Sequence, residues 1–241
     1  MKRRVWVFSF LVVFSFISIN QIYAGTINLN LTVTASNGTN IGIEEYVLSG
    51  DAANGFEWVN DGRDYLIGDG KLLGAIEYLK LNVWEDPAVS LEFHVVAFAS
   101  PINFTITAAK VSFPPIDNPV AYATAGVTLT DRNQNGASIT GLFDGGKLYQ
   151  AVYNDTSAYA NLVSSFTAGI RQTVTQSEGK PVVGTEIIPA TLNNILSSFS
   201  FALSAYDSAS GTSYFEVVPE PATLCLLGLG SLLLLNRKNR K

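Results

Sequence analysis

Strict alternation of side chains from Val89 to Ala99 is the feature that most constrains the fold of this chain. Successive side chains of an extended strand point to opposite faces, so an apolar residue at every second position makes one continuous apolar face. The residues between them include Ser90, Glu92 and His94. The apolar face consists of Val89, Leu91, Phe93, Val95, Ala97 and Ala99. The stretch therefore predicts a β-strand with one face in a core.

Similar stretches, rich in Val, Ile, Thr, Phe and Tyr, recur along most of the chain. Short strands at this spacing are typical of an antiparallel β-sandwich, and a jelly-roll-like arrangement is one form of it. The sequence therefore predicts an all-β fold; only residues 191–198 offer a helical turn as an alternative. The other predicted strands are 26–36, 41–48, 74–84, 102–113, 120–130, 139–143, 148–153, 161–166, 186–188, 195–203 and 212–218.

The connections between the predicted strands carry their own signals. Residues 49–70 are rich in Gly and Asp and predict a long irregular loop. Residues 102–113 are expected to form a hairpin with residues 89–99, followed by a rigid proline-containing link at 114–119. The pair Asn135–Gly136 favours a tight hairpin turn. Residues 172–180 are polar and predict an exposed loop.

The N-terminus has the pattern of a secretory signal peptide at residues 1–24. Lys2, Arg3 and Arg4 precede an apolar run that ends near Ile19. Cleavage is expected between Ala24 and Gly25, which implies export through the Sec translocon. An uncleaved membrane anchor is the alternative.

The C-terminal segment, residues 217–241, combines three features. Pro219, Glu220 and Pro221 are followed by the uncharged apolar run 222–235. A helix of this run would rise about 21 Å, less than the roughly 30 Å of a hydrocarbon core, so the prolines are expected at the membrane surface. Four basic residues end the chain, and they predict a cytoplasmic C-terminus for a membrane helix. They are Arg237, Lys238, Arg240 and Lys241.

This tripartite end resembles the PEP-CTERM protein-sorting signal of Gram-negative bacteria. The resemblance covers about a tenth of the chain and leaves the body, residues 25–216, without an assigned family. It implies that an exosortase recognises Pro219, Glu220 and Pro221 and cuts near them. It also implies a transient inner-membrane anchor and a final place at the cell surface or outside the cell.

Composition limits what the exported body can bind. Without the two terminal segments the body keeps eight basic and 19 acidic residues, a net charge near −11. Nucleic acid is therefore not expected as a partner, because no basic surface is available to neutralise phosphates. The only cysteine is Cys225 of the C-terminal segment, so the body must be stabilised by its core and not by disulfides.

Signals for catalysis are few. His94 is the only histidine, it is expected on the same strand face as Glu92, and no Gly-x-Ser-x-Gly motif accompanies it. A surface histidine is the simpler interpretation, and no catalytic residue is predicted. A zinc site is not expected, since the body offers one histidine and no cysteine.

One loop has the spacing of calcium ligands. Asp131, Asn133 and Asn135 place side-chain oxygens at alternate positions, and Asp144 follows nearby. The same residues also suit a turn, and Leu142 stands where a complete calcium loop would need a glutamate. Calcium is thus a candidate ligand of this loop, with a plain turn as the alternative, and no other cofactor is expected. Asp61, Asp64 and Asp69 form a weaker candidate set.

Three aromatic residues offer flat surfaces for sugars: Trp58, Tyr65 and Trp84. Core packing explains them equally well. Taken together, the sequence predicts a non-enzymatic surface or matrix protein associated with exopolysaccharide. A carbohydrate-binding module is one alternative, and a carbohydrate-active enzyme with paired carboxylates is the other.

Overall fold

Alternating burial along the strands builds two antiparallel sheets that face each other across one core. The computed structural model describes residues 26–51, 55–84 and 87–219. The signal peptide, the Ala24–Gly25 boundary, Glu220, Pro221, the apolar run and the four terminal basic residues lie outside the described residues. The described part consists of strands and turns without a helix, and none of its elements is a membrane-spanning helix.

Sheet A contains nine strands, in the order β12-β11-β16-β7-β1-β2 with three further strands paired beside this path. The strands are β1 (Thr26–Ser36), β2 (Ile41–Asp51), β7 (Ile102–Thr107), β8 (Val111–Asp117), β10 (Ala137–Gly141), β11 (Lys147–Tyr153), β12 (Ser157–Ser164), β13 (Phe166–Ala168) and β16 (Thr191–Leu203).

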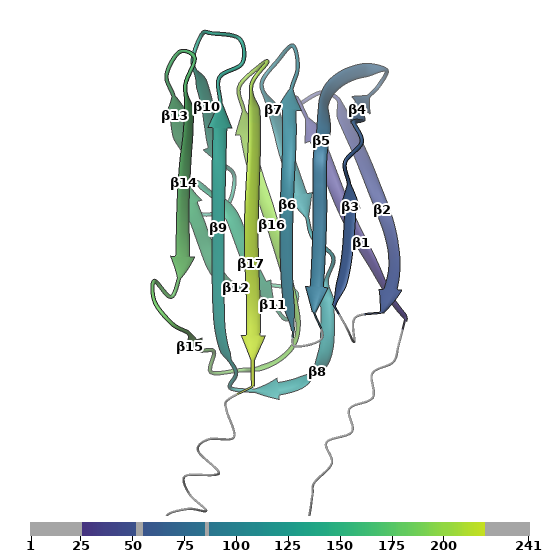
Figure 1. Cartoon of the computed structure of the whole chain (residues 1–241), viewed down its shortest axis with the longest axis vertical. Coiled ribbons are helices and arrows are strands. Elements are labelled where there is room, and N and C mark those ends of the chain that lie inside the picture. Colours follow the sequence, from purple (N-terminus) through teal and green to yellow (C-terminus); the bar gives the residue numbers. More distant parts are fainter. Residues whose placement is uncertain (1–25, 52–54, 85–86, 220–241) are drawn as a thin grey trace, which may run out of the picture.

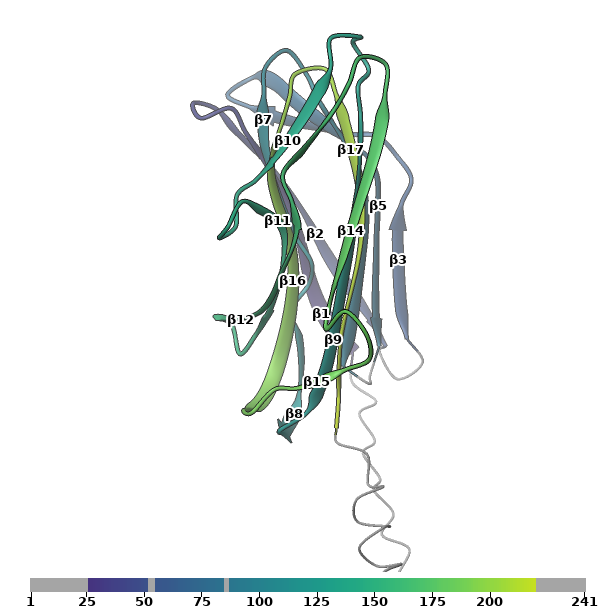
Figure 2. The same ribbon diagram turned by 90° about the vertical axis from the view of Figure 1, so that its left-hand side faces the viewer.

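Sheet B contains eight strands, in the order β14-β9-β17-β6-β5-β3 with β15 beside β9 and β4 beside β5. The strands are β3 (Phe56–Asn60), β4 (Asp64–Gly68), β5 (Lys71–Trp84), β6 (Ala88–Ala97), β9 (Val120–Thr130), β14 (Thr173–Lys180), β15 (Glu186–Ile187) and β17 (Ser208–Val218). Figures 1 and 2 show the two layers from the front and from the side.

The central strands have the order of a jelly roll. In chain order these eight strands are β6, β7, β9, β11, β12, β14, β16 and β17. Sheet B then reads 1-8-3-6 and sheet A reads 2-7-4-5. Closing two sheets in this way leaves few unprotected edges. The predicted antiparallel β-sandwich is confirmed.

Aromatic side chains fill the space between the sheets. The ring of Phe93 on β6 lies 4.9 Å from that of Phe199 and 5.7 Å from that of Phe201, both on β16. All three side chains are almost fully buried. Such offset and edge-on contacts add to the hydrophobic gain of burial. The alternation predicted for 89–99 therefore buries the expected face of β6 as far as Ala97, where the strand ends. Ala99, expected on the same face, lies beyond the strand and is exposed.

Several predicted connections were wrong. The expected loop 49–70 contains β3 and β4, which pair with the long strand β5. The expected exposed loop 172–180 is β14, a polar strand that pairs with β9. The expected rigid link at 114–119 belongs largely to β8, which pairs with β16. In each case a neighbouring strand pairs with the segment and satisfies its backbone groups, which the local sequence does not reveal.

The expected hairpins across 100–101 and 135–136 do not form. Strand β6 pairs with β5 and β17, whereas β7 pairs with β1 and β16 in the other sheet. Likewise β9 lies in sheet B and β10 in sheet A. The turns at these places lead the chain from one sheet to the other, as the jelly-roll order requires.

Candidate functional site

The body ends where the C-terminal segment begins, and the two overlap. Strand β17 continues to Val218, two residues past the boundary predicted at 216. Val217 is fully buried, and Val218 is paired with Val120 of β9. Pro219 follows directly and is exposed. Strand β1 begins and β17 ends at the same end of the sandwich (Figure 1).

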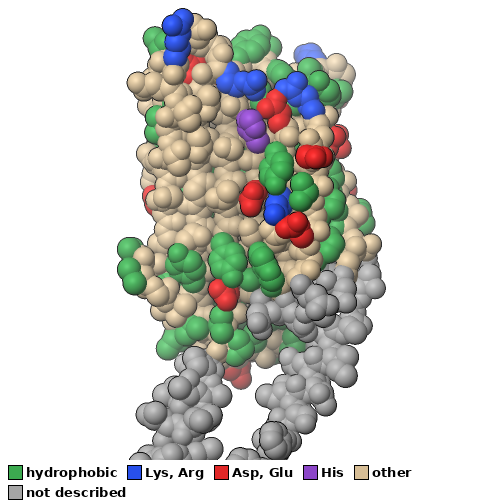
Figure 3. Space-filling model, viewed as in Figure 1, with side chains coloured by type: hydrophobic (Ala, Val, Ile, Leu, Met, Phe, Trp, Pro, Cys, Tyr) green, Lys and Arg blue, Asp and Glu red, His purple; other side chains and the backbone are tan. Residues whose placement is uncertain are grey.

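The outer face of sheet B carries a shallow trough. Two adjoining hollows of about 520 Å³ each make it up, and both are lined by Gly126, Ser177 and Thr212. One hollow extends toward Tyr122 and Tyr214, and the other toward His94 and its neighbours. We call this surface the sheet B trough. Figure 3 shows the face that holds it, where backbone and side chains that are neither hydrophobic nor charged cover most of the surface.

The register of four strands brings the residues of the trough together. Thr212 of β17 lies opposite Glu92 of β6 on one side and Gly126 of β9 on the other, and Gly126 lies opposite Ser177 of β14. Neighbouring rungs supply further hydroxyl groups. They are Ser210, Thr128 and Thr175 in one direction, and Ser90, Tyr214 and Thr124 in the other.

Hydroxyl groups near one end of the trough bind each other across β9 and β14. The side-chain oxygens of Thr128 and Thr175 are 2.8 Å apart, and those of Thr130 and Thr173 are 3.1 Å apart. A hydroxyl group can donate one hydrogen bond and accept two, so these pairs keep further capacity toward solvent or a ligand.

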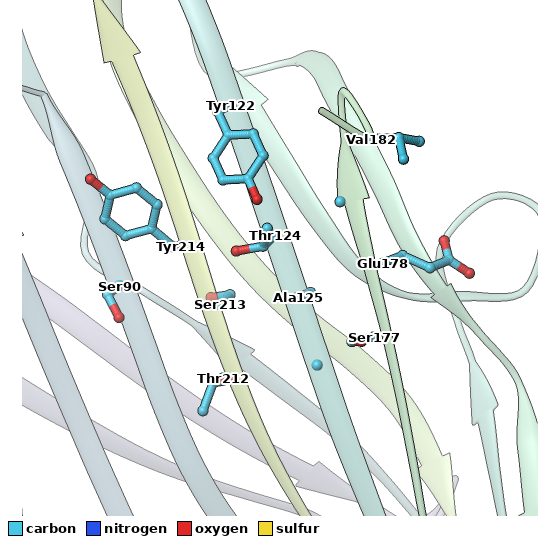
Figure 4. A pocket seen from close by; sticks show the side chains of 12 residues that line it. Ser90, Tyr122, Thr124, Ala125, Ser177, Glu178, Val182, Thr212, Ser213 and Tyr214 are labelled. Atoms are coloured by element: carbon cyan, nitrogen blue, oxygen red, sulfur yellow. The ribbon is translucent and has the colours of Figure 1, made fainter. Parts of the chain in front are cut away.

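Aromatic rings gather at the other end. Tyr122 and Tyr214 stand side by side on β9 and β17, and the Tyr122 hydroxyl group points toward Thr124 (Figure 4). The ring of Trp84 on β5 packs edge-on against that of Tyr214, with 5.9 Å between centroids, and 38% of Trp84 is exposed. The sequence had singled out Trp84 but neither tyrosine, because their convergence depends on strand order.

The other two aromatic candidates lie elsewhere. Trp58 is half-buried, packs against the core and lies 4.9 Å from the ring of Tyr46. Tyr65 is exposed, with the guanidinium of Arg63 5.8 Å from its ring centre. Neither residue lines the trough.

A charged cluster surrounds His94. Glu77 is bonded to Arg63, and its carboxylate also lies 3.6 Å from His94 Nδ1 and 3.7 Å from Arg132. Burial lowers the pKa of His94, and the two arginines act in the same direction against the attraction of Glu77. His94 therefore lies next to Glu77 of β5, and it lines the same hollow as Glu92 of its own strand. In this cluster Arg63 and Arg132 offset the charge of Glu77.

Acidic residues of the trough are separate from each other. Each hollow is lined by one acidic residue, Glu178 in one and Glu92 in the other. Glu178 is ion-paired with Lys147 of sheet A at 2.8 Å. Although burial alone would raise its pKa, Lys147 and the N–H groups of Val163 and Ser164 hold the pKa of Glu178 below its usual range.

The calcium candidate organises a loop. The Asp131 carboxylate accepts N–H groups from Arg171 at 2.6 Å and Gln134 at 2.9 Å, which ties two turns together. Asn133 donates its amide to the carbonyl of Ala205. Burial would raise the pKa of Asp131, but the backbone donors hold it below its usual range. Asn135 donates its backbone N–H to Asn133.

The other candidate calcium ligands do not form a common site among the described residues. Asp64 binds the Tyr46 hydroxyl and the Asn60 amide, and Asp144 is exposed. Within residues 26–51, 55–84 and 87–219, no three His, Cys, Asp or Glu side chains form a group that could hold a metal ion. The calcium site stays a prediction.

Comparison with known proteins identifies the C-terminal segment. Residues 217–241 match the family model of the PEP-CTERM protein-sorting motif. The resemblance of this segment is thereby confirmed, and it supports an exosortase-sorted extracellular protein. Curated proteins give no match to the chain.

Solved structures give weak likenesses. The chain is similar to a structure of infectious bursal disease virus Gx strain with 12% identity, 83% of this chain and 59% of that chain covered, and a TM-score of 0.30. It thus spans 59% of that viral chain. A structure of the Gt strain gives 11% identity, coverages of 84% and 68%, and a TM-score of 0.15. These scores support no conclusion about function.

Proposed function

We propose that this chain is a non-enzymatic component of the cell surface or extracellular matrix that associates with exopolysaccharide. The sorting motif at residues 217–241 supports export and membrane-transient sorting to the surface. The finer steps are part of the proposal: secretion through the Sec translocon, cleavage after Ala24, and cutting by an exosortase near Pro219. The proposed role requires neither catalysis nor a cofactor.

The single observation that carries the association with polysaccharide is the sheet B trough. It is wide and shallow, and it combines hydroxyl groups with the rings of Tyr122 and Tyr214. Sugar rings present apolar faces and many hydroxyl groups, so aromatic faces and hydroxyl-bearing side chains are the partners that suit them. An open surface also fits a polymer, because a long chain can lie across it without inserting one of its ends.

The positions of the acidic residues favour binding over hydrolysis. Glycoside hydrolysis usually needs two carboxyl groups about 5–9.5 Å apart. Glu92 and Glu178 lie on strands separated by β17 and β9, a distance of about 14 Å at ordinary strand spacing. The ion pair of Glu178 with Lys147 further directs that carboxylate toward sheet A.

The proposal is tested by incubating the mature protein with the extracellular polysaccharide of the cells that produce it. Retention of the protein without any release of reducing ends is the expected result. Release of reducing ends that disappears in Glu92→Gln would instead indicate a carbohydrate-active enzyme. Absence of both retention and release would overturn the proposal and leave only the sorting signal.

A further inference from the structure

We infer that the sheet B trough is a binding site for one uncharged polysaccharide chain that lies along strands β9 and β17, with Gly126 as its floor. The inference rests on the proposed association with polysaccharide and assigns it to named residues. It follows from the floor, the walls, the charge and the length of the trough.

The floor is open because two outward positions lack side chains. Gly126 and Gly179 face outward on the neighbouring strands β9 and β14. Glycine weakens a strand, and inside one it often marks a place where a ligand approaches the backbone. A Cβ atom at Gly126 would lie 3.6 Å from Ser177 Cβ and 3.7 Å from Thr212 Oγ1. Those are ordinary contact distances, so packing within the protein does not require glycine there.

The walls provide two kinds of contact. At one end the rings of Tyr122 and Tyr214 offer apolar faces (Figure 4). The ring of Trp84 packs edge-on against that of Tyr214. Along the trough, Thr124, Thr128 and Thr212 project hydroxyl groups. Hydroxyl groups both donate and accept, which suits the hydroxyl groups of a sugar chain in more than one register.

Charge selects an uncharged ligand. The body is strongly acidic, and both acidic residues that line the trough lie at its margins on β6 and β14. Among the described residues no lysine or arginine lines either hollow, and the lining residue Glu178 is paired with Lys147. A polyanionic chain would find no free cation here and would be repelled by the net charge of the body.

The length of the trough fits a chain rather than a single sugar. Tyr122 and Thr128 lie six residues apart on β9, which is about 20 Å along an extended strand. The hollows join at Gly126, so the path between these residues is continuous. Several sugar units can therefore contact the protein at once, each weakly.

The test compares variants of the mature protein for retention by the producing cells' own polysaccharide. Gly126→Leu fills the floor and is expected to weaken retention at least tenfold. Tyr122→Ala removes a wall and should weaken it severalfold, which keeps the test valid should the leucine variant fold poorly. Retention should not change between low and high salt, because an uncharged ligand is not held by screened charges.

Two controls match these changes. Ser198→Leu places the same side chain on the outer face of sheet A, and Tyr65→Ala removes an exposed tyrosine outside the trough. Both should be retained like the wild type. Circular dichroism should show the same β-strand content for all variants and the wild type.

Each outcome separates the two claims. No retention of the wild type overturns the proposed function and with it this inference. Equal retention of the wild type and Gly126→Leu overturns the site alone. Loss of retention in high salt overturns the claim that the bound polysaccharide is uncharged. If Gly126→Leu changes the oligomeric state in light scattering but leaves retention unaltered, the face serves self-association, and the inference is overturned.

Discussion

The backbone N–H of Val217 donates a hydrogen bond to the carbonyl oxygen of Pro87 at 2.9 Å. The first residue of the sorting motif is therefore part of the folded sandwich, and only Pro219 separates the last strand from Glu220. A protein held by its C-terminal segment would have the end of the sandwich that contains the start of β1 next to the membrane.

This overlap predicts where the mature chain ends. A cut before Val218 would remove a paired residue from β17, so we expect the mature C-terminus at or beyond Val218. Intact-mass measurement of protein recovered from the surface or medium checks this. Peptides containing Leu232 to Leu235 in that fraction would show that the segment is not removed, and a shorter chain would contradict the overlap.

Val217→Ala should destabilise the body although it lies within the sorting motif. The change removes buried apolar volume and should lower the free energy of unfolding by about 2 kcal/mol. Pro219→Ala, at an exposed position, should change it by less than about 0.5 kcal/mol. Urea denaturation of the mature proteins measures both, and equal effects would argue against the burial of Val217.

Tyr149→Phe should not destabilise the protein. The Tyr149 hydroxyl is buried between the sheets near Ser197 and Ser213, and among the described residues none of these three oxygens makes a hydrogen bond of good geometry. Burial raises the pKa of Tyr149. Removing an unsatisfied hydroxyl should be neutral or stabilising by up to about 1 kcal/mol. A decrease of more than about 1 kcal/mol in the free energy of unfolding, measured by thermal or urea unfolding, would show that the hydroxyl is hydrogen-bonded.

His94 should make stability depend on pH. Its pKa is lowered in the folded protein, first by burial and then by Arg132 and Arg63. The unfolded chain therefore binds the proton more readily, so stability is full above about pH 6.5 and falls as the pH drops below it. The effect should stay below about 1 kcal/mol because solvent screens the half-exposed ring.

The measurement is urea unfolding at pH 7.5 and pH 5. His94→Gln should lose less stability than the wild type over this range, in which the carboxylates with lowered pKa remain ionised. An identical loss in both proteins would assign the pH dependence to other groups.

Local patterns in the sequence were sufficient for some features. The sorting motif was predicted from the order of prolines, apolar residues and basic residues, because a membrane selects on hydropathy and charge near one another in the chain. The alternation from Val89 to Ala99 predicted a half-buried strand for the same kind of reason: burial on one face shows directly in the side chains.

Only the tertiary structure decided which segments pair and what they bring together. Residues 172–180 are too polar to predict a strand, and they form one because β9 satisfies their backbone groups. Glu77, His94 and Arg132 meet through strand order. The trough arises in the same way, since β6, β9, β14 and β17 come from four distant parts of the chain. Hydrogen bonds between strands join residues that are far apart in the sequence. The periodicity of side chains within one strand therefore does not reveal which strand pairs with it.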